Sequence, residues 1–533
     1  MDTHLTPHFI DYYTTGKFSK IVTDYISHDA SLKEFYNHVP TLEGIKSAIE
    51  EKKQVPVNRE VLVRCLTRQY ESLNPSEKVL KNIQLLLKEN TFSICTAHQP
   101  NIFTGHLYFI YKIMHVIRLA DVLSKELSAY HFVPVFFIGS EDADIEELNH
   151  IELERQEYTW NTKQTGAVGR MIIDKDFLAL IQSFEGRIKA EHHGTEVMEM
   201  VREAYTKGRT IQDATLHFVH SLFADFGLVA IIADDPAFKK EMFEIFKNDL
   251  FEHEPAQIVN ETSKRIAEIH HAQAFARDIN LFYMKDNLRN RIVFSENKFV
   301  VHDTDISFTK ETLLKELDEH PERFSPNVIL RGLFQETILP DIAFVGGGGE
   351  LAYWLQLKDL FNHFNVPYPV LFLRNSFLII QKKWKDILDK NNLTNEDIFR
   401  DKEKLITGIV QKNSKHNLDL SAEKATLENF FDTLAEKTSK VDVTLKEHVQ
   451  ALKARQLKNL AAIQNKMVAA EKKNMDATVR QINKVMLALH SDGLQERTEN
   501  FMLFYALWGK DFLQNIYAFS STWDPKFCIL TEM

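Results

Sequence analysis

The sequence predicts an α/β protein with a parallel sheet covered on both faces, followed by a long helical segment. Two observations support this fold class. Short apolar runs recur along the chain, each followed by polar residues and then by a helical pattern; they span residues 92–96, 132–138, 228–232, 342–345 and 369–373. Near-continuous apolar strands that alternate with helices are typical of buried parallel sheets. After Gly408 there is no glycine until Gly493 and no proline until Pro525, which favours long helices.

Composition excludes several classes of protein. With 533 residues, 44% of them hydrophobic, the chain can form a large core and more than one structural unit. A net charge of -11 argues against a general nucleic-acid surface. The cysteines, Cys65, Cys95 and Cys528, form no CxxC pair, which fits a reducing compartment. Residues 1–18 lack the apolar region of a secretory signal, and no apolar run approaches the roughly 18 residues that span a bilayer. We therefore expect a cytoplasmic protein that binds neither nucleic acid nor membrane.

The alternation of strands and helices gives the expected domain organisation. A strand-containing core spans residues 1–384 and is interrupted by inserted connecting segments at about residues 174–210 and 250–323. A helical coiled-coil domain follows at residues 385–490, rich in Lys, Glu, Ala, Leu and Gln. Residues 491–533 are aromatic-rich and amphipathic, and we expect them to return to the core.

Heptad-like spacing within the helical domain predicts a coiled-coil hairpin. Spacings of three, four and three positions relate Leu460, Ile463, Met467 and Ala470. A second group with similar spacing follows after a break in register, and it contains Met475, Val479, Ile482, Met486 and Leu489. An ordinary helical bundle packed on the core is the alternative. Because the apolar stripe lacks a local partner in sequence, we expect the segment from about Ser421 to Leu489 to form a homodimer.

The first candidate site follows residues 92–96, at the edge of a parallel sheet where ligands bind. Polar side chains crowd one strand-to-helix turn there: His98, Gln99, Asn101, Thr104 and His106. The helix that follows carries Tyr108 and Lys112. Thr104 and Gly105 are expected to cap this helix, leaving N–H groups free to receive a phosphate or carboxylate. A hydrogen-bonded structural histidine is the alternative for His98 or His106 alone, but the cluster as a whole favours a site.

The second candidate site follows residues 132–138. Glu141, Asp142 and Asp144 come directly after this run, and Asn149 follows them. Carboxylates at a strand end can hold an ammonium group, a ribose hydroxyl or a divalent metal. The alternative is capping of the next helix, which explains one or two acids but not all of these residues.

The third candidate site is the run of four glycines after residues 342–345. Gly346, Gly347, Gly348 and Gly349 match neither a Walker sequence nor a dinucleotide-binding fingerprint, but they permit close approach of a ligand to the backbone. Glu350 places a negative charge where a phosphate would sit, so the turn better suits an amine or hydroxyl. Tyr353 and Gln356 lie on the next turns. A tight turn for close helix packing is the alternative.

Two arginines flank these strands and complete the candidate set. Arg331 and Arg374 could each bind a carboxylate through two parallel hydrogen bonds. With acids at Glu141, Asp142 and Glu350 on the other side, such a site suits zwitterionic or mixed-charge ligands.

Four separated motifs, in order, resemble the bacillithiol biosynthesis cysteine-adding enzyme family, the cysteine ligases. They are FTGHLYFIYK, PVFFIGSEDADIEELNH, LPDIAFVGGGGELAYWLQLKDLF and GLQER, and the order matches across nearly the whole chain. The resemblance implies a nucleotidyltransferase-like Rossmann core with two connecting insertions and a coiled-coil domain that pairs subunits. It also implies an enzyme that forms an amide by joining cysteine to the amine of glucosaminyl-malate.

The chain departs from this family at several positions. The family commonly reads TGQQxGLFTGPLY, whereas this chain reads TAHQPNIFTGHLY, so that Ala97, His98, Asn101 and His106 replace the usual residues. Ala143 stands where the family's EDHD has a histidine. These departures leave open another nucleotidyltransferase-like ligase acting on a different amine, or a non-catalytic coiled-coil scaffold.

We expect catalytic roles for His98, Glu141, Asp142 and Asp144, and substrate binding by the remaining candidates. ATP or another nucleotide is the expected activating cofactor, because amide formation needs an activated carboxylate, although no ATP motif is evident. No metal ligands are assigned, and the need for a metal stays open.

Overall fold

The computed structural model describes residues 5–490 and 493–533 and divides the chain into two units. The first extends to Leu378 and includes Gln495–Leu530; the second contains Ile379–Leu494 and Thr531–Met533. Residues 491–492, at the start of the predicted C-terminal segment, lie outside the described residues. The helical unit is therefore inserted in sequence between two parts of the first unit.

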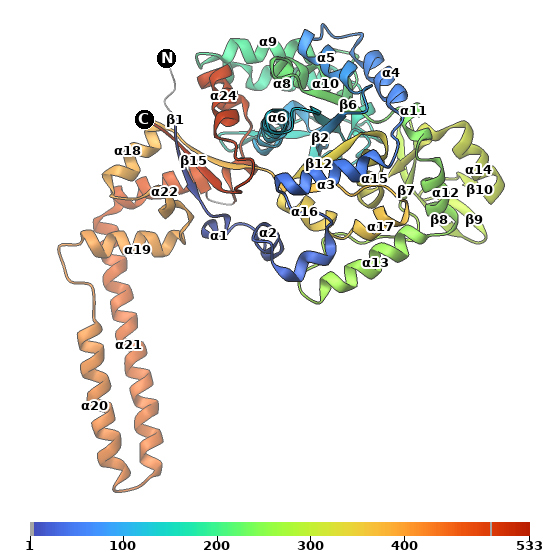
Figure 1. Cartoon of the computed structure of the whole chain (residues 1–533). Coiled ribbons are helices and arrows are strands. Elements are labelled where there is room, and N and C mark those ends of the chain that lie inside the picture. The colour runs from blue at the N-terminus through green and yellow to red at the C-terminus, as the bar shows by residue number, and fades with distance from the viewer. Residues whose placement is uncertain (1–4, 491–492) are drawn as a thin grey trace. The chain divides into compact units, whose positions relative to one another are not determined.

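A five-stranded parallel sheet forms the centre of the first unit, as predicted (Figure 1). Its order is β13-β12-β2-β3-β6, and every neighbouring pair is parallel. The strands are β2 (Thr91–His98), β3 (His131–Ile138), β6 (Val229–Ile232), β12 (Asp341–Gly346) and β13 (Val370–Leu373). Nearly all their residues are buried, which explains the continuous apolar runs in the sequence.

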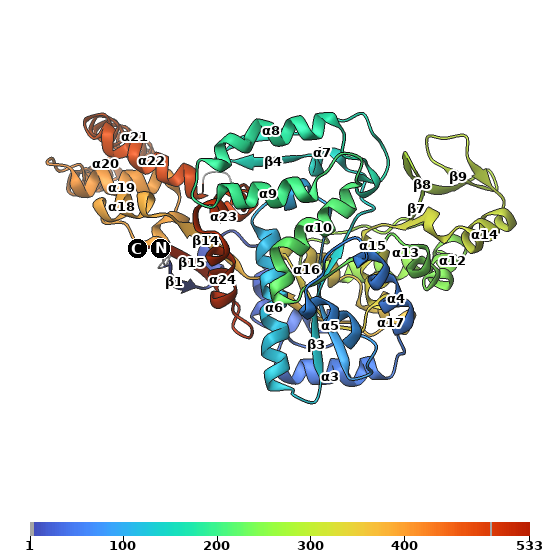
Figure 2. The same ribbon diagram turned by 90° about the horizontal axis from the view of Figure 1, so that it is seen from above.

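Helices α3 (Leu42–Lys53) and α6 (Tyr108–Glu126) bury apolar side chains against this sheet. Ile45, Ile49 and Val116 contribute to a core shared with strand residues such as Ile94 and Val345. Helix α5 (Glu77–Leu85) contacts β3 and β6 (Figure 2). Since α6 is anchored to two central strands, the residues on its first turns are held at a fixed place beside the sheet edge.

The strand order reverses between β2 and β12. From β2 the chain continues to β3 and β6 on one side, and β12 and β13 lie on the other side. Loops that leave two such strands turn away from each other, which opens a crevice at their carboxyl ends. Gln99 and His106, which follow β2, and Gly347 to Gly349, which follow β12, meet at this crevice.

Two further groups of elements lie in the regions predicted as insertions. The first region contains α8 (Lys175–Lys189) and α9 (Gly194–Ala204). The second carries most of an antiparallel sheet with the order β10-β9-β8-β7-β11. Its strands are β7 (Leu281–Lys285), β8 (Leu288–Ser295), β9 (Lys298–Val301), β10 (Ser307–Phe308) and β11 (Phe324–Pro326). Helix α15 (Val328–Ile338) follows β11 directly and leads the chain back to β12.

The second unit is helical and contains the predicted coiled-coil hairpin. Helix α20 (Ser421–Ser439) lies along α21 (Thr444–Asn474), and Figure 1 shows them side by side. Helix α22 (Asp476–His490) begins after Met475, which is where the heptad-like pattern changes register. A small core packs α19 (Lys402–Asn413) against α21 and α22 through Ile406, Val468 and Ile482.

The hairpin itself buries few apolar side chains. Phe431, Ala435 and Val449 form its buried cluster, whereas Phe430 is 60% exposed and Ile463 is 52% exposed. The chain thus leaves apolar surface on the hairpin, which a single copy does not cover. Within residues 5–490 and 493–533, no helix combines the length and the apolar character needed to cross a lipid bilayer.

Candidate functional site

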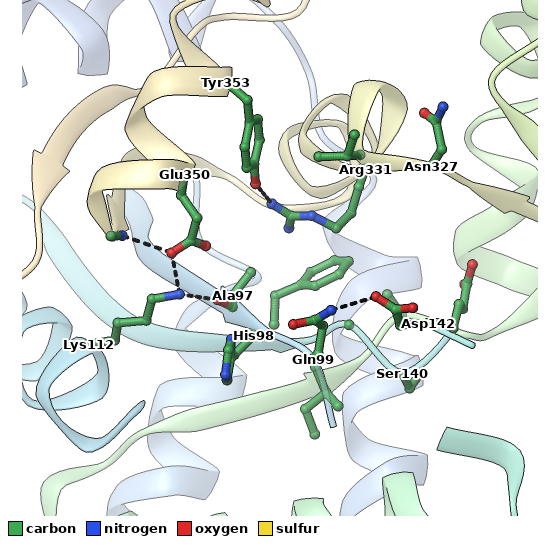
Figure 3. Close-up of a pocket in the computed structure, with 18 of the residues that line it drawn as sticks. Ala97, His98, Gln99, Lys112, Ser140, Asp142, Asn327, Arg331, Glu350 and Tyr353 are labelled. Carbon is green, nitrogen blue, oxygen red and sulfur yellow. Dashed lines mark hydrogen bonds and ion pairs between the residues drawn. The ribbon is translucent and has the colours of Figure 1, made fainter. Parts of the chain in front are cut away.

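A pocket of about 570 Å³ lies across the carboxyl ends of all five parallel strands. Each strand leads into residues that line it: His98 ends β2, Gly139 follows β3, Ala233 follows β6, Gly347 follows β12 and Arg374 follows β13. Helices α6, α15 and α16 (Gly348–Trp354) supply further side chains. The candidate residues from separate parts of the sequence therefore converge on one cavity (Figure 3).

Lys112 and Glu350 form an ion pair at one side of this pocket (Figure 3). The buried ammonium group of Lys112 also donates to the carbonyl oxygen of Ala97 at 2.9 Å. Glu350 accepts from the N–H of Gly347 at 2.8 Å, so this carboxylate closes the start of α16. Burial lowers the pKa of Lys112, and the neighbouring Glu350 opposes the shift without cancelling it. That this turn suits an amine or hydroxyl better than a phosphate stays a prediction.

A second, fully buried ion pair joins Arg374 to Glu496. The guanidinium donates two parallel hydrogen bonds, from Nη1 at 2.9 Å and from Nη2 at 2.7 Å. Burial lowers the pKa of Arg374, but the charge of Glu496 and its hydrogen bonds outweigh this and leave the pKa above its ordinary value. The Arg374 guanidinium carbon lies 5.2 Å from the centre of the Tyr108 ring. Its Nε, also buried, has no hydrogen-bond partner in the described structure.

The four glycines differ in what a side chain would meet. A Cβ on Gly347 would lie 3.4 Å from Glu350 Oε2 and 3.5 Å from Arg374 Nε, between the two charged groups of the pocket. A Cβ on Gly348 would meet Val22 at 3.0 Å, and one on Gly346 would meet the Phe344 ring at 2.8 Å. Packing thus explains Gly346 and Gly348. At Gly347 the missing side chain instead leaves room beside Arg374 Nε, which has no hydrogen-bond partner in the described structure.

The two histidines of the first candidate site are held in the neutral form. Burial, reinforced by the positive charge of Lys112, holds the pKa of His98 well below its usual range. Burial lowers the pKa of His106 to about 4. His98 Nε2 and His106 Nδ1 are buried without a hydrogen-bond partner among the described residues. Both rings line the pocket, so each presents a neutral imidazole to a ligand.

The acids after β3 have separate surroundings. Glu141 pairs with the fully buried Lys239, whose Nζ lies 2.6 Å from Glu141 Oε1. Asp142 accepts a hydrogen bond from Gln99 Nε2 at 2.7 Å (Figure 3). Asp144 does not line the pocket; its carboxylate caps α7 (Ile145–Leu148) by accepting from the N–H of Glu147. Helix capping therefore accounts for Asp144, and Asp142 is the pocket-lining acid of this group with only neutral hydrogen-bond donors in the described structure.

Arg331 projects from the end of the first turn of α15 into the pocket (Figure 3). Its Nη2 donates to Tyr353 Oη at 2.6 Å, and its Nη1 lies 3.4 Å from Gln335 Oε1. Both partners are uncharged, so the positive charge of Arg331 is not neutralised by direct contact.

The pocket brings together most of the predicted site residues. Those that line it are His98, Gln99, His106, Tyr108, Lys112, Glu141, Asp142, Arg331, Gly347, Gly348, Gly349, Glu350, Tyr353 and Arg374. Those that do not are Asn101, Thr104, Gly105, Asp144, Asn149, Gly346 and Gln356.

The expected helix cap at Thr104–Gly105 is wrong. Helix α6 begins at Tyr108, its N-cap is Leu107, and no side chain caps it. Phe103, Thr104 and Gly105 all have positive φ, and buried Asn500 donates to the carbonyl oxygens of Phe103 and Gly105. The residues that looked like a cap instead form a left-handed connection fixed by the C-terminal segment.

Other residues outside the pocket hold neighbouring loops. Gln356 is buried, and its Oε1 accepts from the N–H groups of Gln273 and Ala274. Asn149 donates to the carbonyl oxygen of Trp160 at 3.3 Å. Asn101 donates to the carbonyl oxygen of Glu147 at 3.2 Å. These polar side chains satisfy backbone groups, which is a structural role.

Sequence reasoning missed several residues that line the pocket. Ala97, Ser140, Ala233, Arg289, Asn327 and Arg497 are among them. Arg497 and Glu496 belong to the GLQER motif, which was recognised in the sequence but given no role. Ala233 and Ser140 follow predicted strands, so their place at the sheet edge could have been predicted from the sequence. Arg289 lies on β8 of the antiparallel sheet, in a region with no sequence signal for a site.

In the described part of the chain, no group of three or more His, Cys, Asp or Glu side chains could hold a metal ion. The side chains that line the pocket present ammonium, guanidinium, carboxylate and imidazole groups.

Comparison with known proteins identifies the family. Residues 6–375 match the family described as bacillithiol biosynthesis BshC, N-terminal Rossmann-like domain, and residues 377–532 match bacillithiol biosynthesis BshC, C-terminal coiled-coil domain. A relative from Flavobacterium johnsoniae named "Putative cysteine ligase BshC" is 38% identical, covering 93% of this chain and 94% of its own. Relatives with the same name from Flavobacterium psychrophilum and Cytophaga hutchinsonii are 36% and 38% identical, covering 95% and 92% of this chain and 96% and 92% of theirs. The chain therefore belongs to the BshC family of bacillithiol biosynthesis.

Proposed function

We propose that this chain is a cysteine ligase that joins the carboxyl group of cysteine to the amine of glucosaminyl-malate. The charge pattern of the pocket carries the proposal. Five cationic side chains, Lys112, Arg289, Arg331, Arg374 and Arg497, and three acidic ones, Glu141, Asp142 and Glu350, line it. A net positive lining on a chain with a net charge of -11 suits a ligand that has an amine and more than one carboxylate.

Asp142 is the acid assigned to the substrate amine. Its direct partners are neutral donors, Gln99 Nε2 at 2.7 Å and the N–H of Asp144 at 3.1 Å. Its negative charge therefore remains available to a ligand ammonium group, whereas the charge of Glu141 is matched by Lys239. In this proposal Asp142 orients the amine and takes up the proton that the amine loses.

The reaction forms one C–N bond and breaks one bond at the cysteine carbonyl carbon. The ammonium group first gives one proton to Asp142; the resulting amine nitrogen attacks that carbon, the activating group leaves with the electron pair of its bond, and a second proton leaves the nitrogen for solvent. His98, with its low pKa, is a neutral acceptor that can orient an N–H group. The ammonium group of Lys112 and the free Nε of Arg374 are donors for the oxygen atom on which negative charge develops.

We propose ATP or another nucleotide as the activating co-substrate, because a free carboxylate does not form an amide at a useful rate. The N–H of Gly347 is taken by Glu350, so the glycine turn does not fit a phosphate. We therefore assign no nucleotide contact to this turn.

The direct test is a reaction of the purified full-length chain with cysteine, glucosaminyl-malate and ATP. We expect formation of bacillithiol, detected by thiol labelling and mass spectrometry, and its loss in Lys112→Met. Amide formation with a different amine only would favour another ligase of the same fold. Absence of any product, together with normal thiol levels in a deletion strain, would favour a scaffold and would contradict the proposal.

We also propose that the chain forms a homodimer through the coiled-coil hairpin. The exposed side chains of Phe430 and Ile463 support this, because a second copy would cover apolar surface that one copy leaves in water. Replacing both residues with lysine should give a monomer in light scattering while the helix content is retained. A dimer that persists would contradict this interface.

A cytoplasmic location is part of the same proposal. It is supported by Cys65, Cys95 and Cys528, which are buried as free thiols. Fractionation of cells that express the chain should recover it with cytoplasmic marker proteins; recovery with periplasmic markers would contradict this location.

A further inference from the structure

Four of the eight charged side chains that line the pocket have a charged partner in the described structure. Lys112 pairs with Glu350, Arg374 pairs with Glu496, and Glu141 pairs with Lys239. In the described structure, Arg289 and Arg331 form no ion pair with any carboxylate although both line the cavity. Arg497 also lines it, but its side chain is exposed to solvent. Two guanidinium groups therefore face the same cavity with their charge uncompensated by direct contact.

Arg289 is held rigidly by uncharged groups. Its Nε donates to Ser325 Oγ at 3.0 Å, and its Nη2 lies 3.4 Å from the carbonyl oxygen of Pro326. The guanidinium carbon is 3.9 Å from the centre of the Phe282 ring, which fixes the plane of the group. No hydrogen bond of its Nη1 is found within the described residues. A guanidinium so oriented loses little side-chain freedom when it binds an anion.

Arg331 lies on α15, the helix that directly follows the β11 residues that Arg289 contacts. Arg289 reaches the carbonyl of Pro326, and the helix that carries Arg331 begins two residues later, at Val328. Arg331 ends the first turn of that helix, so about 5 Å of helix rise separates it from the helix start. Tyr353 and Gln335 hold its guanidinium on the other side. Both guanidinium groups line the same pocket, so one ligand with two anionic groups is expected to meet them both.

Burial dominates the surroundings of Arg289. It lowers the pKa of Arg289, while the carboxylates of Glu141 and Asp142 act in the opposite direction. Within the described structure neither acid forms an ion pair or hydrogen bond with Arg289; Glu141 pairs with Lys239, and Asp142 accepts from Gln99. A carboxylate that reached Arg289 would thus meet a partly desolvated, unpaired cation, where charge-assisted hydrogen bonds are strongest.

We propose that Arg289 and Arg331 form a clamp for a short dicarboxylate, one guanidinium for each carboxylate. This proposal rests on the proposed function, in which the dicarboxylate is the malate arm of the substrate. The antiparallel sheet thereby supplies a specificity residue, Arg289, for a ligand whose amine lies toward Asp142 at the ends of the parallel strands. The clamp selects amines that carry a dicarboxylate over amino sugars that have no carboxylate.

The test is titration calorimetry of the full-length chain with three probes: glucosaminyl-malate, L-malate, and a methyl glycoside of glucosamine, which has the amine but no carboxylate. Arg289→Gln should weaken binding of both malate-containing probes by about ten- to a hundredfold and leave binding of the glycoside unchanged. Arg289→Lys should give an intermediate loss, because it keeps the charge but not the planar fork. Arg291→Gln is the matched control, since Arg291 lies on the same strand but does not line the pocket.

Titration with ADP separates a dicarboxylate from a phosphate as the bound anion. Loss of ADP affinity in Arg289→Gln, with malate-containing probes unaffected, would assign the arginine to a nucleotide and overturn the clamp. Equal affinity of wild type and Arg289→Gln for glucosaminyl-malate would also overturn it, and would leave the proposed function intact. If L-malate binds through Arg289 but glucosaminyl-malate is not a substrate, the clamp stands and the proposed function fails.

Discussion

Replacing Glu496 with glutamine is expected to destabilise the first unit strongly. Glu496 is fully buried, and Arg374 is 2% exposed, so neither charge has access to water once the pair is broken. Two short parallel hydrogen bonds join them. Removing one partner of a buried ion pair typically costs about 3–5 kcal/mol, because the other charge stays buried without compensation. Glutamine keeps one acceptor, so we expect a loss of about 3 kcal/mol in the free energy of unfolding.

Urea denaturation, followed by circular dichroism and by tryptophan fluorescence, measures this loss. The two probes separate the first unit from the helical unit if these unfold at different urea concentrations. The double variant Arg374→Met, Glu496→Leu should regain most of the lost stability, because an apolar pair of similar size carries no desolvation cost. A loss below about 1 kcal/mol in Glu496→Gln, or a double variant as unstable as the sum of the single ones, would refute the reasoning.

Three further predictions concern the glycine turn, the acids after β3 and a buried aspartate. Gly347→Ala should reduce ligand affinity about tenfold with little change in melting temperature, whereas Gly186→Ala, on α8 outside the pocket and with nothing within 4 Å of its Cβ, should leave affinity unchanged; calorimetry and thermal melts distinguish a packing role, which would lower stability instead. Asp142→Asn should weaken binding of glucosaminyl-malate by about ten- to a hundredfold and leave binding of ADP almost unchanged. The nearby variant Asp144→Asn, which retains the helix cap, should change the affinity for neither ligand. Equal effects of the two variants would contradict recognition of the amine by Asp142. Burial raises the pKa of Asp249 to about 7 from an ordinary value of 3.8. The folded chain therefore keeps a proton that the unfolded chain releases above about pH 4, and the stability contributed by this group should fall as pH rises from about 4 to 7. Urea titrations at pH 5 and pH 8 should show a smaller difference in Asp249→Asn than in wild type; an unchanged difference would exclude this group.

Local sequence signals were sufficient for the parallel sheet and for much of the pocket. Apolar runs such as residues 132–138 could be recognised because a strand buried on both faces needs apolar residues at every position. The ends of these strands in the sequence predict which residues lie at the edge of the sheet, and Asp142 and Lys112 are among them. The helical domain was also accessible from its heptad-like spacing, but Met467, Met475, Val479, Ile482 and Met486, which have that spacing, pack in the small core with α19 and not in the hairpin cluster.

Contacts between distant segments were not accessible in the same way. The partner of Arg374 lies 122 residues away in Glu496, and Lys239 reaches Glu141 from a helix with no motif. The left-handed φ of Phe103 and Thr104 also has no local signal, because these side chains ordinarily avoid that region and are held there by Asn500. Only the tertiary structure brings these groups together, and a single sequence read by itself gives no indication of such pairings.

The division of the first unit into two parts of the sequence has a consequence for synthesis of the protein. Arg374 leaves the ribosome 122 residues before Glu496, and at roughly 5–20 residues per second this interval lasts about 6–24 s. During that time the strands of the sheet are complete, but the cation at its edge has no counter-ion, and the loop that Asn500 later fixes has no donor. The nascent chain must therefore wait, with an unfinished pocket, until the whole helical unit has been made. Slow codons or a translational pause within residues 379–494 would lengthen this vulnerable period without changing a single contact of the finished molecule.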